Sequence, residues 1–122
     1  MPPRELSDKE KAAFAANPAF EKAAQRESKQ LLKLPNTDEL LDLYGLYKVA
    51  CDEDIKGPDA FPQGRPSIFN LKGAKKYDYW AKILDEKLTP AEAQERYVAK
   101  VEELKEKYGF DASKEPEVVG SN

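Results

Sequence analysis

The sequence predicts an all-α protein: a four-helix bundle preceded by a short extra helix, with a long loop between the second and third bundle helices. Two observations carry this prediction. Helix-capping patterns recur along the chain, and apolar residues return every three or four positions, as they do on one face of an α-helix. No segment shows the strict alternation of apolar and polar residues that is typical of a β-strand.

Capping residues and prolines mark the first two helices. Ser7 and Glu10 have the spacing of a capping box, which predicts a short helix that Pro18 ends. Proline is tolerated in the first turn of a helix, so we expect Pro18 to open the next one. That second helix is predicted to continue to about Lys33, because Pro35 closes it.

The next two helices lie on either side of the loop. Asn36 and Glu39 form a second capping box, which predicts a helix as far as about Ala50. Helical spacing resumes near Lys72 and includes Trp80, which we expect in the interior of the bundle.

The last helix has the most complete start signal in the chain. Thr89 is suited to the N-cap, Pro90 to the first helical position and Glu92 to the third. Gly109 is predicted to end this helix. Residues 111–122 contain few side chains suited to packing, and we expect them to form a loose tail.

The predicted loop is rich in residues that break helices, and it leads into a basic stretch. Five glycines and prolines fall within ten residues, at Gly57, Pro58, Pro62, Gly64 and Pro66. Long loops in compact domains often carry function. Residues 56–76 also hold five cations, Lys56, Arg65, Lys72, Lys75 and Lys76, against the single acid Asp59. This excess of positive charge indicates a surface that can meet an anion.

Composition argues against several functional classes. The chain has 122 residues, which suits one domain, and nothing in it demands more than a monomer. It contains no histidine, so the commonest general base and the commonest metal ligand are missing, and we expect no enzyme activity, no metal and no cofactor. The net charge of −3 argues against a general nucleic-acid binder.

The cysteine content and the apolar segments bear on the environment of the chain. Cys51 is the only cysteine, so no internal disulfide can form, and we expect this residue to be buried. No apolar stretch approaches the roughly 20 residues needed to cross a bilayer. The first residues lack the apolar segment of a signal peptide, and we therefore expect a cytoplasmic location.

The helix that begins at Asn36 carries a candidate binding motif of Tyr44, Tyr47 and Lys48. Tyr44 and Lys48 are four residues apart and share one side of this helix. Tyrosine offers a flat ring with a hydroxyl and lysine a compact cation, so the group suits a phosphorylated nucleotide. The alternative is that both tyrosines pack in the core and Lys48 is solvated. The residues alone favour this alternative, because aromatic residues at helical spacing usually serve packing.

Three motifs, in order along the chain, favour the binding role over the packing role, because they resemble a known family. They are LDLYGLYKVA at residues 41–50, LKGAKKYDYW at residues 71–80, and a stretch over residues 93–109 that includes VEEL. Together with FEKAA at residues 20–24, they closely resemble the acyl-CoA-binding protein family.

This resemblance implies both a fold and a function. The fold is an acyl-CoA-binding-protein-like bundle over residues 18–110, with an N-terminal extension over residues 1–17 and a flexible C-terminal tail over residues 111–122. The function is non-catalytic binding and intracellular transport or buffering of medium- to long-chain fatty acyl-CoA esters, with the acyl chain shielded in a groove. The implied partners are acyl-CoA esters, with transient contact to acyl-CoA-using enzymes and membrane surfaces.

The resemblance also implies roles for six site residues, carried over by position. Tyr44, Lys48 and Lys76 would hold the ribose 3′-phosphate of coenzyme A, and Tyr47 would contact the adenine. Tyr97 would contribute from the last helix, although a role in the core alone remains open for it. Lys72 is a further candidate cation, and for it a surface role without ligand contact remains open.

The sequence departs from the family pattern mainly in the loop over residues 52–70, which is several residues longer than usual. We expect Phe61, Ile68 and Phe69 in this loop to form a lid over the acyl tail. Two rival functions remain. A helical interaction module would use the tyrosine-rich face for a partner helix, which leaves the nearby lysines unexplained. A thioester hydrolase would need a nucleophile and a base, and the sequence offers neither.

Overall fold

The computed structural model describes residues 5–116, and the regular secondary structure of this part of the chain is helical. Its elements are α1 (Asp8–Ala16), α2 (Pro18–Gln25), the 3-10 turn η1 (Glu27–Lys29), α3 (Thr37–Ala50), α4 (Leu71–Asp85) and α5 (Pro90–Tyr108). Within these residues the extended pairing is limited to one antiparallel bridge, between Leu31 and Phe110. The predicted all-α class, the extra N-terminal helix and the long loop are confirmed.

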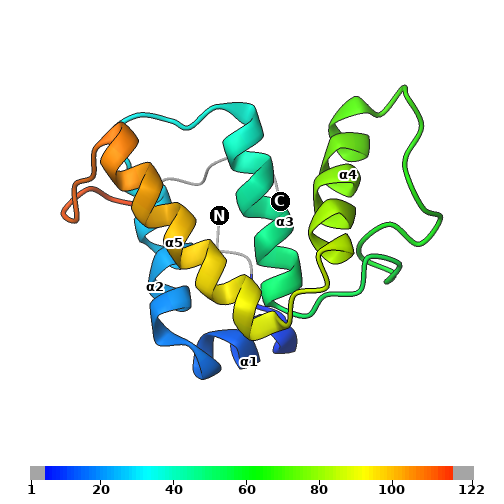
Figure 1. The fold of residues 1–122 in the computed structure, drawn as a ribbon, viewed down its shortest axis with the longest axis horizontal. Coiled ribbons are helices and arrows are strands. Elements are labelled where there is room, and N and C mark those ends of the chain that lie inside the picture. The colour runs from blue at the N-terminus through cyan, green and yellow to red at the C-terminus, as the bar shows by residue number, and fades with distance from the viewer. Residues whose placement is uncertain (1–4, 117–122) are drawn as a thin grey trace.

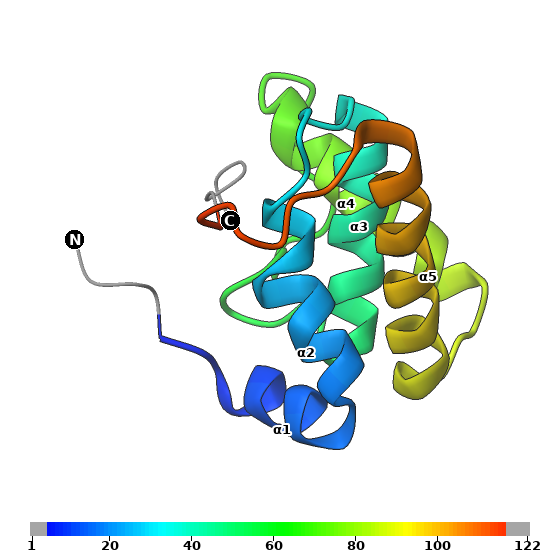
Figure 2. The same cartoon turned by 90° about the vertical axis from the view of Figure 1, so that its left-hand side faces the viewer.

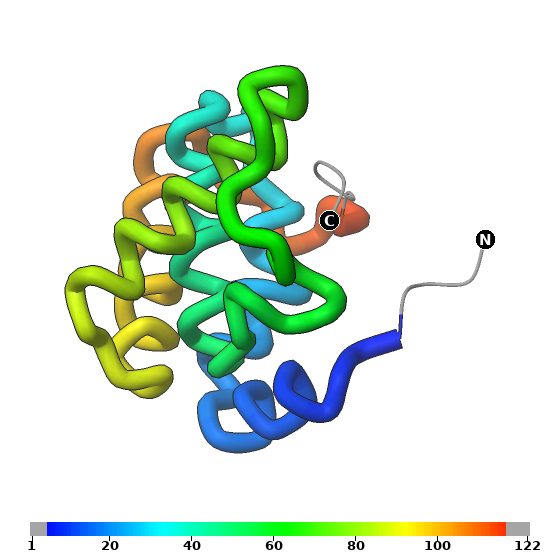
Figure 3. Tube along the Cα trace, turned by 90° about the vertical axis from the view of Figure 1, so that its right-hand side faces the viewer, coloured from blue at the N-terminus to red at the C-terminus, as the bar shows by residue number. Residues whose placement is uncertain are grey.

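Helix α3 is the centre of the arrangement. It packs against α4 on one side and α5 on the other, while α2 packs against α5. Figure 1 shows α2, α5 and α3 close together and α4 on the outer side of α3. Helix α1 crosses one end of this group, as Figure 2 shows after a quarter turn. The loop between α3 and α4 runs along the outside of α4 (Figure 3).

The predicted helix starts are confirmed, because each is set by local hydrogen bonds. All three capping boxes form, and their paired residues are Ser7 with Glu10, Asn36 with Glu39, and Thr89 with Glu92. Pro18 and Pro90 occupy the first turns of α2 and α5. Gly109 ends α5 with a φ of 81°, a left-handed value that glycine adopts without the steric penalty of other residues.

The end of the second helix was predicted wrongly. We expected a helix to about Lys33, but α2 ends at Gln25 and is followed by η1. The chain then extends, and Leu32 donates a backbone hydrogen bond to the carbonyl oxygen of Gly109 at 3.0 Å. Backbone groups that would have bonded within a longer α2 therefore form hydrogen bonds with residues that are distant in the sequence.

Part of the C-terminal segment that we expect to form a loose tail makes specific contacts with the bundle. The side chain of Gln30 is 2% exposed, and its amide nitrogen donates to the carbonyl oxygens of Ala112 at 3.0 Å and Lys114 at 2.9 Å. The ammonium of Lys114 donates in return to the carbonyl oxygen of Leu31 at 2.8 Å. A buried amide needs such partners, so it holds residues 111–116 against the 30–31 segment. Residues 117–122 lie outside the described part of the chain.

The core contains both residues whose burial was predicted above. Trp80 is 1% exposed and Cys51 is fully buried, as predicted. Burial and the nearby carboxylate of Glu10 raise the pKa of the Cys51 thiol to about 12, so the thiol stays protonated at neutral pH. Leu84, which shares helical spacing with Trp80, is 40% exposed and lies outside the core.

The N-terminal extension packs on the bundle through α1. The ring of Phe14 is 3% exposed and lies 5.5 Å from the ring of Phe20 and 6.3 Å from that of Tyr47. Glu10 is 2% exposed, and Lys9 donates a 2.6 Å hydrogen bond to the carbonyl oxygen of Asp52. Helix α1 thus covers the end of α3 that leads into the loop.

A membrane-spanning segment is not present among the helices of residues 5–116, since none of them combines the necessary length and apolar character.

Candidate anion-binding site

Tyr44, Lys48 and Lys76 converge in the structure. The ammonium of Lys48 lies 5.7 Å from the centre of the Tyr44 ring, and the ammonium of Lys76 lies 5.2 Å from the same ring. Tyr44 and Lys48 are one helical turn apart on α3, whereas Lys76 reaches the ring from α4. The structure therefore brings two cations from two helices to one tyrosine ring, an arrangement suited to a phosphate group.

The ring of Trp80 packs beside Tyr44 and Lys48. Its ring centre lies 6.2 Å from that of Tyr44 in an edge-on arrangement, and the ammonium of Lys48 lies 5.8 Å from it. Among the described residues the buried indole nitrogen of Trp80 has no hydrogen-bond partner. An unpaired buried donor carries a desolvation penalty of roughly 1–3 kcal/mol. Because Trp80 is 1% exposed and its ring contacts that of Tyr44, it serves packing and supports the position of the Tyr44 ring.

Gly45 allows the two helices of the site to approach each other. A Cβ atom at this position would lie 2.8 Å from the carbonyl oxygen of Tyr79, which belongs to the backbone of α4. Any larger residue would push α3 away from α4 and so separate Tyr44 from Lys76. Sequence reasoning missed this residue, although a glycine inside a predicted helix, which costs about 1 kcal/mol relative to alanine, is a recognised sign of close packing.

The charges of the site favour a bound anion. Burial lowers the pKa of the Lys76 ammonium, and the positive charges of Lys72 and Lys48 lower it further. The ammonium of Lys76 is thus repelled by those of Lys72 and Lys48, and a phosphate beside it would relieve this repulsion. Burial, with the charge of Glu53, raises the pKa of Tyr44 to about 12, so its hydroxyl remains a neutral donor. Lys72 lies one turn before Lys76 on α4 and is exposed.

Tyr47 and Tyr97 belong to a neighbouring aromatic cluster. Their ring centres are 6.0 Å apart, and both pack on Phe20, at 5.7 Å and 5.2 Å respectively. Tyr97 is 5% exposed, which matches the alternative that it serves the core. Its pKa is raised to about 12 by burial, while a hydrogen bond with Ser28 opposes the shift.

The hydroxyl of Tyr47 is already engaged by the N-terminal helix. It donates a short hydrogen bond to the carboxylate of Glu10, and burial followed by this contact raises the pKa of Tyr47 well above its usual range. Tyr47 as a residue is half-buried. Sequence reasoning missed the role of Glu10, because the capping box with Ser7 already accounted for it.

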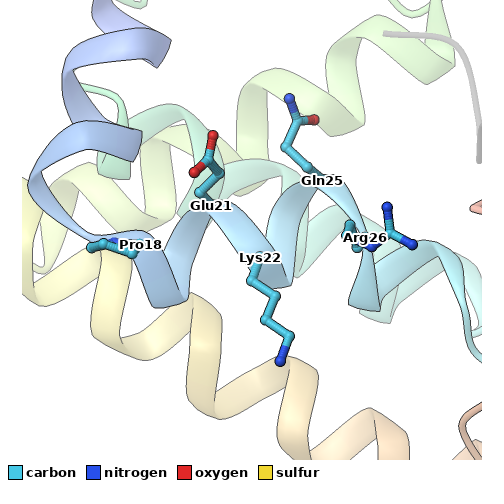
Figure 4. Close-up of a pocket in the computed structure, with 5 residues that line it drawn as sticks. All are labelled: Pro18, Glu21, Lys22, Gln25 and Arg26. Carbon is cyan, nitrogen blue, oxygen red and sulfur yellow. The ribbon is translucent and has the colours of Figure 1, made fainter. Parts of the chain in front are cut away.

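Two hollows on the described surface lie apart from this site. The larger one, of about 520 Å³, is lined by Pro18, Glu21, Lys22, Gln25 and Arg26 on α2. Figure 4 shows the side chains of Glu21, Lys22 and Gln25 extending outward from this helix, which makes it an open surface. The other, of about 210 Å³, lies around residues 28–35 and 114. Across residues 5–116 there is no cluster of three or more side chains suited to a metal ion.

The long loop is attached to α4 at defined points. The Phe61 ring lies 5.4 Å from that of Tyr77 and 6.1 Å from that of Trp80. The guanidinium of Arg65 forms two hydrogen bonds with the Asp78 carboxylate, at 2.8 and 3.0 Å. These contacts hold the loop beside the site. Of the three residues expected in a lid, Phe61 is packed in this way, whereas Ile68 and Phe69 are exposed, and their covering of an acyl tail stays a prediction.

The protein is a small helical bundle in which lysine ammonium groups lie near the rings of Tyr44 and Trp80. These features define the class of small helical proteins that bind an anionic ligand. Residues 17–101 match the family model described as "Acyl CoA binding protein". An acyl-CoA-binding protein homolog from Manduca sexta is 40% identical over 85 residues, which cover 70% of this chain and 86% of the relative. The crystal structure of Oryza sativa acyl-CoA-binding protein 2 superposes with a TM-score of 0.60 and 35% identity, covering 79% of this chain and 95% of that one.

The chain belongs to the acyl-CoA-binding protein family. This is a family of binding proteins whose ligand is acyl-CoA. Helix α1 precedes the matched residues and is an addition to the family domain.

Proposed function

We propose that this protein is a non-catalytic carrier that binds medium- to long-chain fatty acyl-CoA esters and transports or buffers them in the cytoplasm as a monomer. The observation that carries the proposal is the convergence of the Lys48 and Lys76 ammonium groups on the Tyr44 ring. The family of the chain supplies the class of ligand.

The head of the ligand is assigned to the residues of the site. The ribose 3′-phosphate is placed between the two ammonium groups and the Tyr44 hydroxyl, with Lys72 as an additional cation at the edge. Each charge-assisted hydrogen bond of this kind contributes roughly 1.5–3 kcal/mol. Such contacts orient the ligand and select a phosphorylated head.

The adenine is assigned to the ring of Tyr47. This residue adjoins Lys48 on α3 and is half-buried rather than fully buried. An aromatic ring stacked on a base contributes about 1–3 kcal/mol. Tyr97 is buried and is assigned an indirect contribution, because it packs on the Tyr47 ring and fixes its position.

The acyl chain supplies most of the affinity in this proposal. Burying one methylene contributes about 0.8 kcal/mol, so eight to ten methylenes contribute roughly 6–8 kcal/mol before ordering costs. Nanomolar binding requires about 12 kcal/mol, which neither the head nor the tail reaches comfortably alone. A carrier that combines both therefore discriminates against free coenzyme A and against free fatty acid.

Transient contacts with acyl-CoA-using enzymes and with membrane surfaces complete the proposal, since a carrier must receive and release its ligand. Nucleic acid is not a proposed partner, in keeping with the net charge of −3. Hydrolysis of the thioester is not proposed either, because the chain contains no histidine and its one cysteine is buried with a raised pKa.

The proposal is tested by calorimetry of the full-length protein with palmitoyl-CoA, coenzyme A and palmitate. We expect palmitoyl-CoA to bind at least about a hundredfold more tightly than either fragment. Lys76→Ala should weaken palmitoyl-CoA binding about tenfold or more. Lys82→Ala is the matched control, because Lys82 is an exposed lysine on the same helix whose ammonium lies 6.0 Å from the Tyr79 ring centre.

Equal affinity for palmitoyl-CoA and coenzyme A would contradict the carrier proposal. Equal effects of the Lys76 and Lys82 substitutions would contradict the assigned site. Native mass spectrometry of protein purified from cells adds an independent check, because a carrier retains acyl-CoA whereas a helical interaction module retains a protein partner.

A further inference from the structure

The turn that leads into α4 carries an exposed apolar patch. Phe69 is 93% exposed, Ile68 is 76% exposed and Leu71 is 61% exposed. Single exposed apolar residues are ordinary on protein surfaces, but three within four positions, one of them an almost fully exposed phenylalanine, indicate an interaction surface. We call Ile68, Phe69 and Leu71 the apolar tip.

Hydrogen bonds hold the apolar tip in a defined conformation. The backbone nitrogen of Asn70 donates to the carbonyl oxygen of Ser67 at 2.9 Å, which closes a turn around Ile68 and Phe69. The side chain of Asn70 then caps α4 by accepting a 3.1 Å hydrogen bond from the nitrogen of Gly73. The tip is therefore a preformed surface feature.

The tip also lies at a corner of the molecule. Figure 1 shows that the chain immediately before α4 forms an outer corner of the fold, and Figure 3 shows the same segment projecting beyond the neighbouring helix ends. The bidentate contact between Arg65 and Asp78 attaches the preceding loop to the side of α4. A flat partner can therefore approach the tip without meeting the body of the bundle.

Positive charge surrounds the apolar tip. Residues 65–76 contain Arg65, Lys72, Lys75 and Lys76 and no acidic residue. Asp78, the first acidic residue after this segment, pairs with Arg65. Lys75 is exposed and lies one helical turn after Leu71, so a cation and an apolar side chain share one face of α4. The N-terminus of α4 adds the positive end of a helix dipole at the same place.

From this combination we propose that the apolar tip docks the protein on the surface of an anionic lipid bilayer, with Ile68, Phe69 and Leu71 entering the interface between headgroups and acyl chains and the flanking lysines contacting anionic headgroups. Exposed apolar side chains beside lysines are the chemistry that binds such an interface, because burial of apolar area and attraction to anionic lipid act together. A rigid protein partner would need a complementary groove, whereas a lipid interface accepts a convex tip.

This docking surface gives the proposed carrier a place to contact membranes, but its test does not require acyl-CoA. Full-length protein without added ligand is sedimented with phosphatidylcholine vesicles and with vesicles that contain about a third phosphatidylserine. We expect binding to the anionic vesicles to be about tenfold stronger, and to weaken as salt is added, because salt screens the attraction of lysines to headgroups.

Variants separate the tip from general surface effects. The double substitution Ile68→Ser and Phe69→Ser should reduce binding to anionic vesicles about tenfold or more. Lys75→Glu should remove most of the preference for anionic over neutral vesicles. Leu34→Ser is the matched control, since Leu34 is 66% exposed outside the tip, and it should leave vesicle binding unchanged. Circular dichroism checks that each variant is folded.

Three results would overturn the proposal: no binding of the unmodified protein to anionic vesicles, no effect of the double substitution, or an equal effect of Leu34→Ser. Loss of palmitoyl-CoA affinity in the double variant, together with no vesicle binding by the unmodified protein, would assign the tip to the acyl tail. Failure of docking with normal palmitoyl-CoA binding would leave the carrier function intact, so the two proposals fail separately.

Discussion

The hydroxyl of Tyr47 on α3 donates a hydrogen bond to the carboxylate of Glu10 on α1, which joins the N-terminal extension to the helix that carries the candidate site. Glu10 is 2% exposed, and its other oxygen accepts a 2.9 Å hydrogen bond from the backbone nitrogen of Ser7. A buried carboxylate is stabilised only by such donors. The Tyr47 hydroxyl therefore keeps its hydrogen-bond partner only while α1 is packed against α3.

Removal of this donor should destabilise the fold. We expect Tyr47→Phe to lower the free energy of unfolding by about 1–3 kcal/mol, because the carboxylate of Glu10 stays buried without that hydrogen bond. Urea unfolding measures the change. Tyr79→Phe is the control, because its hydroxyl donates to the Asp38 carboxylate at an exposed position and should contribute less than about 0.5 kcal/mol. Equal losses in the two variants would show that burial of Glu10 is not the cause.

Substitution at the contact between α3 and α4 should affect both stability and binding. Gly45→Ala places a Cβ atom 2.8 Å from the carbonyl oxygen of Tyr79, so the helices must separate. We expect a net loss of roughly 1–3 kcal/mol despite the better helix propensity of alanine, together with weaker palmitoyl-CoA binding. Denaturant unfolding and calorimetry report the two effects.

Gly73→Ala is the matched variant for that experiment. The three atoms nearest to its Cβ, at 2.6 Å or more, all belong to the side chain of Asn70, which can shift at the cost of the 3.1 Å hydrogen bond that it accepts from the nitrogen of Gly73. We expect a smaller loss of stability than at Gly45. A Gly45 variant with unchanged stability and affinity would contradict the view that close helix approach builds the site.

Head contacts should act equally on ligands of every chain length. Tyr44→Phe keeps the ring against Trp80 but removes the hydroxyl assigned to the phosphate. We expect affinity to fall by a similar factor, about tenfold, for butyryl-CoA, decanoyl-CoA and palmitoyl-CoA, because each loses one hydrogen bond to a charged group. Calorimetry across the series measures the factor. A loss that grows with chain length would place Tyr44 beside the tail.

Acid should weaken the fold through Glu39. Its carboxylate accepts hydrogen bonds from Lys107, at 2.8 Å, and from Tyr108, and together these contacts lower its pKa to about 2 from an ordinary 4.5. Between these values the unfolded chain binds more protons than the folded one, so stability is complete above pH 4.5 and declines as pH falls towards 2.

A variant isolates this contribution of Glu39. Glu39→Gln removes the charge but retains a side chain that completes the capping box with Asn36. We expect the variant to be less stable than the unmodified protein at pH 7 and the difference to shrink as pH approaches 2, measured by thermal unfolding. A difference that stays constant with pH would refute this account.

The starts of the helices were predictable from the sequence because their causes are local. The side chains of Ser7, Asn36 and Thr89 each accept a hydrogen bond from the backbone nitrogen three positions ahead. The whole capping pattern therefore lies within four consecutive residues. The end of α2 was not predictable, because its cause is the pairing of the 30–32 segment with residues 109–114, about eighty positions away.

The candidate site was predictable only in part. Tyr44 and Lys48 share a face by helical spacing, but spacing within α3 says nothing about where α4 places Lys76. The resemblance of the motifs suggested that they meet, and the packing of α4 on α3 brings them together. The partner of Tyr47 lay in the extension, outside the motifs, and nothing local indicated it.

The sequence by itself determined the helical class, the helix starts and the residues available for the site, because capping and periodicity act over a few neighbouring positions. Tertiary structure alone decided that Glu10 engages Tyr47, that Gln30 holds the C-terminal segment and that Phe69 stays outside the core. These outcomes depend on which distant surfaces come within a few ångströms of one another. That depends on the packing of whole helices and cannot be derived from any short stretch of residues.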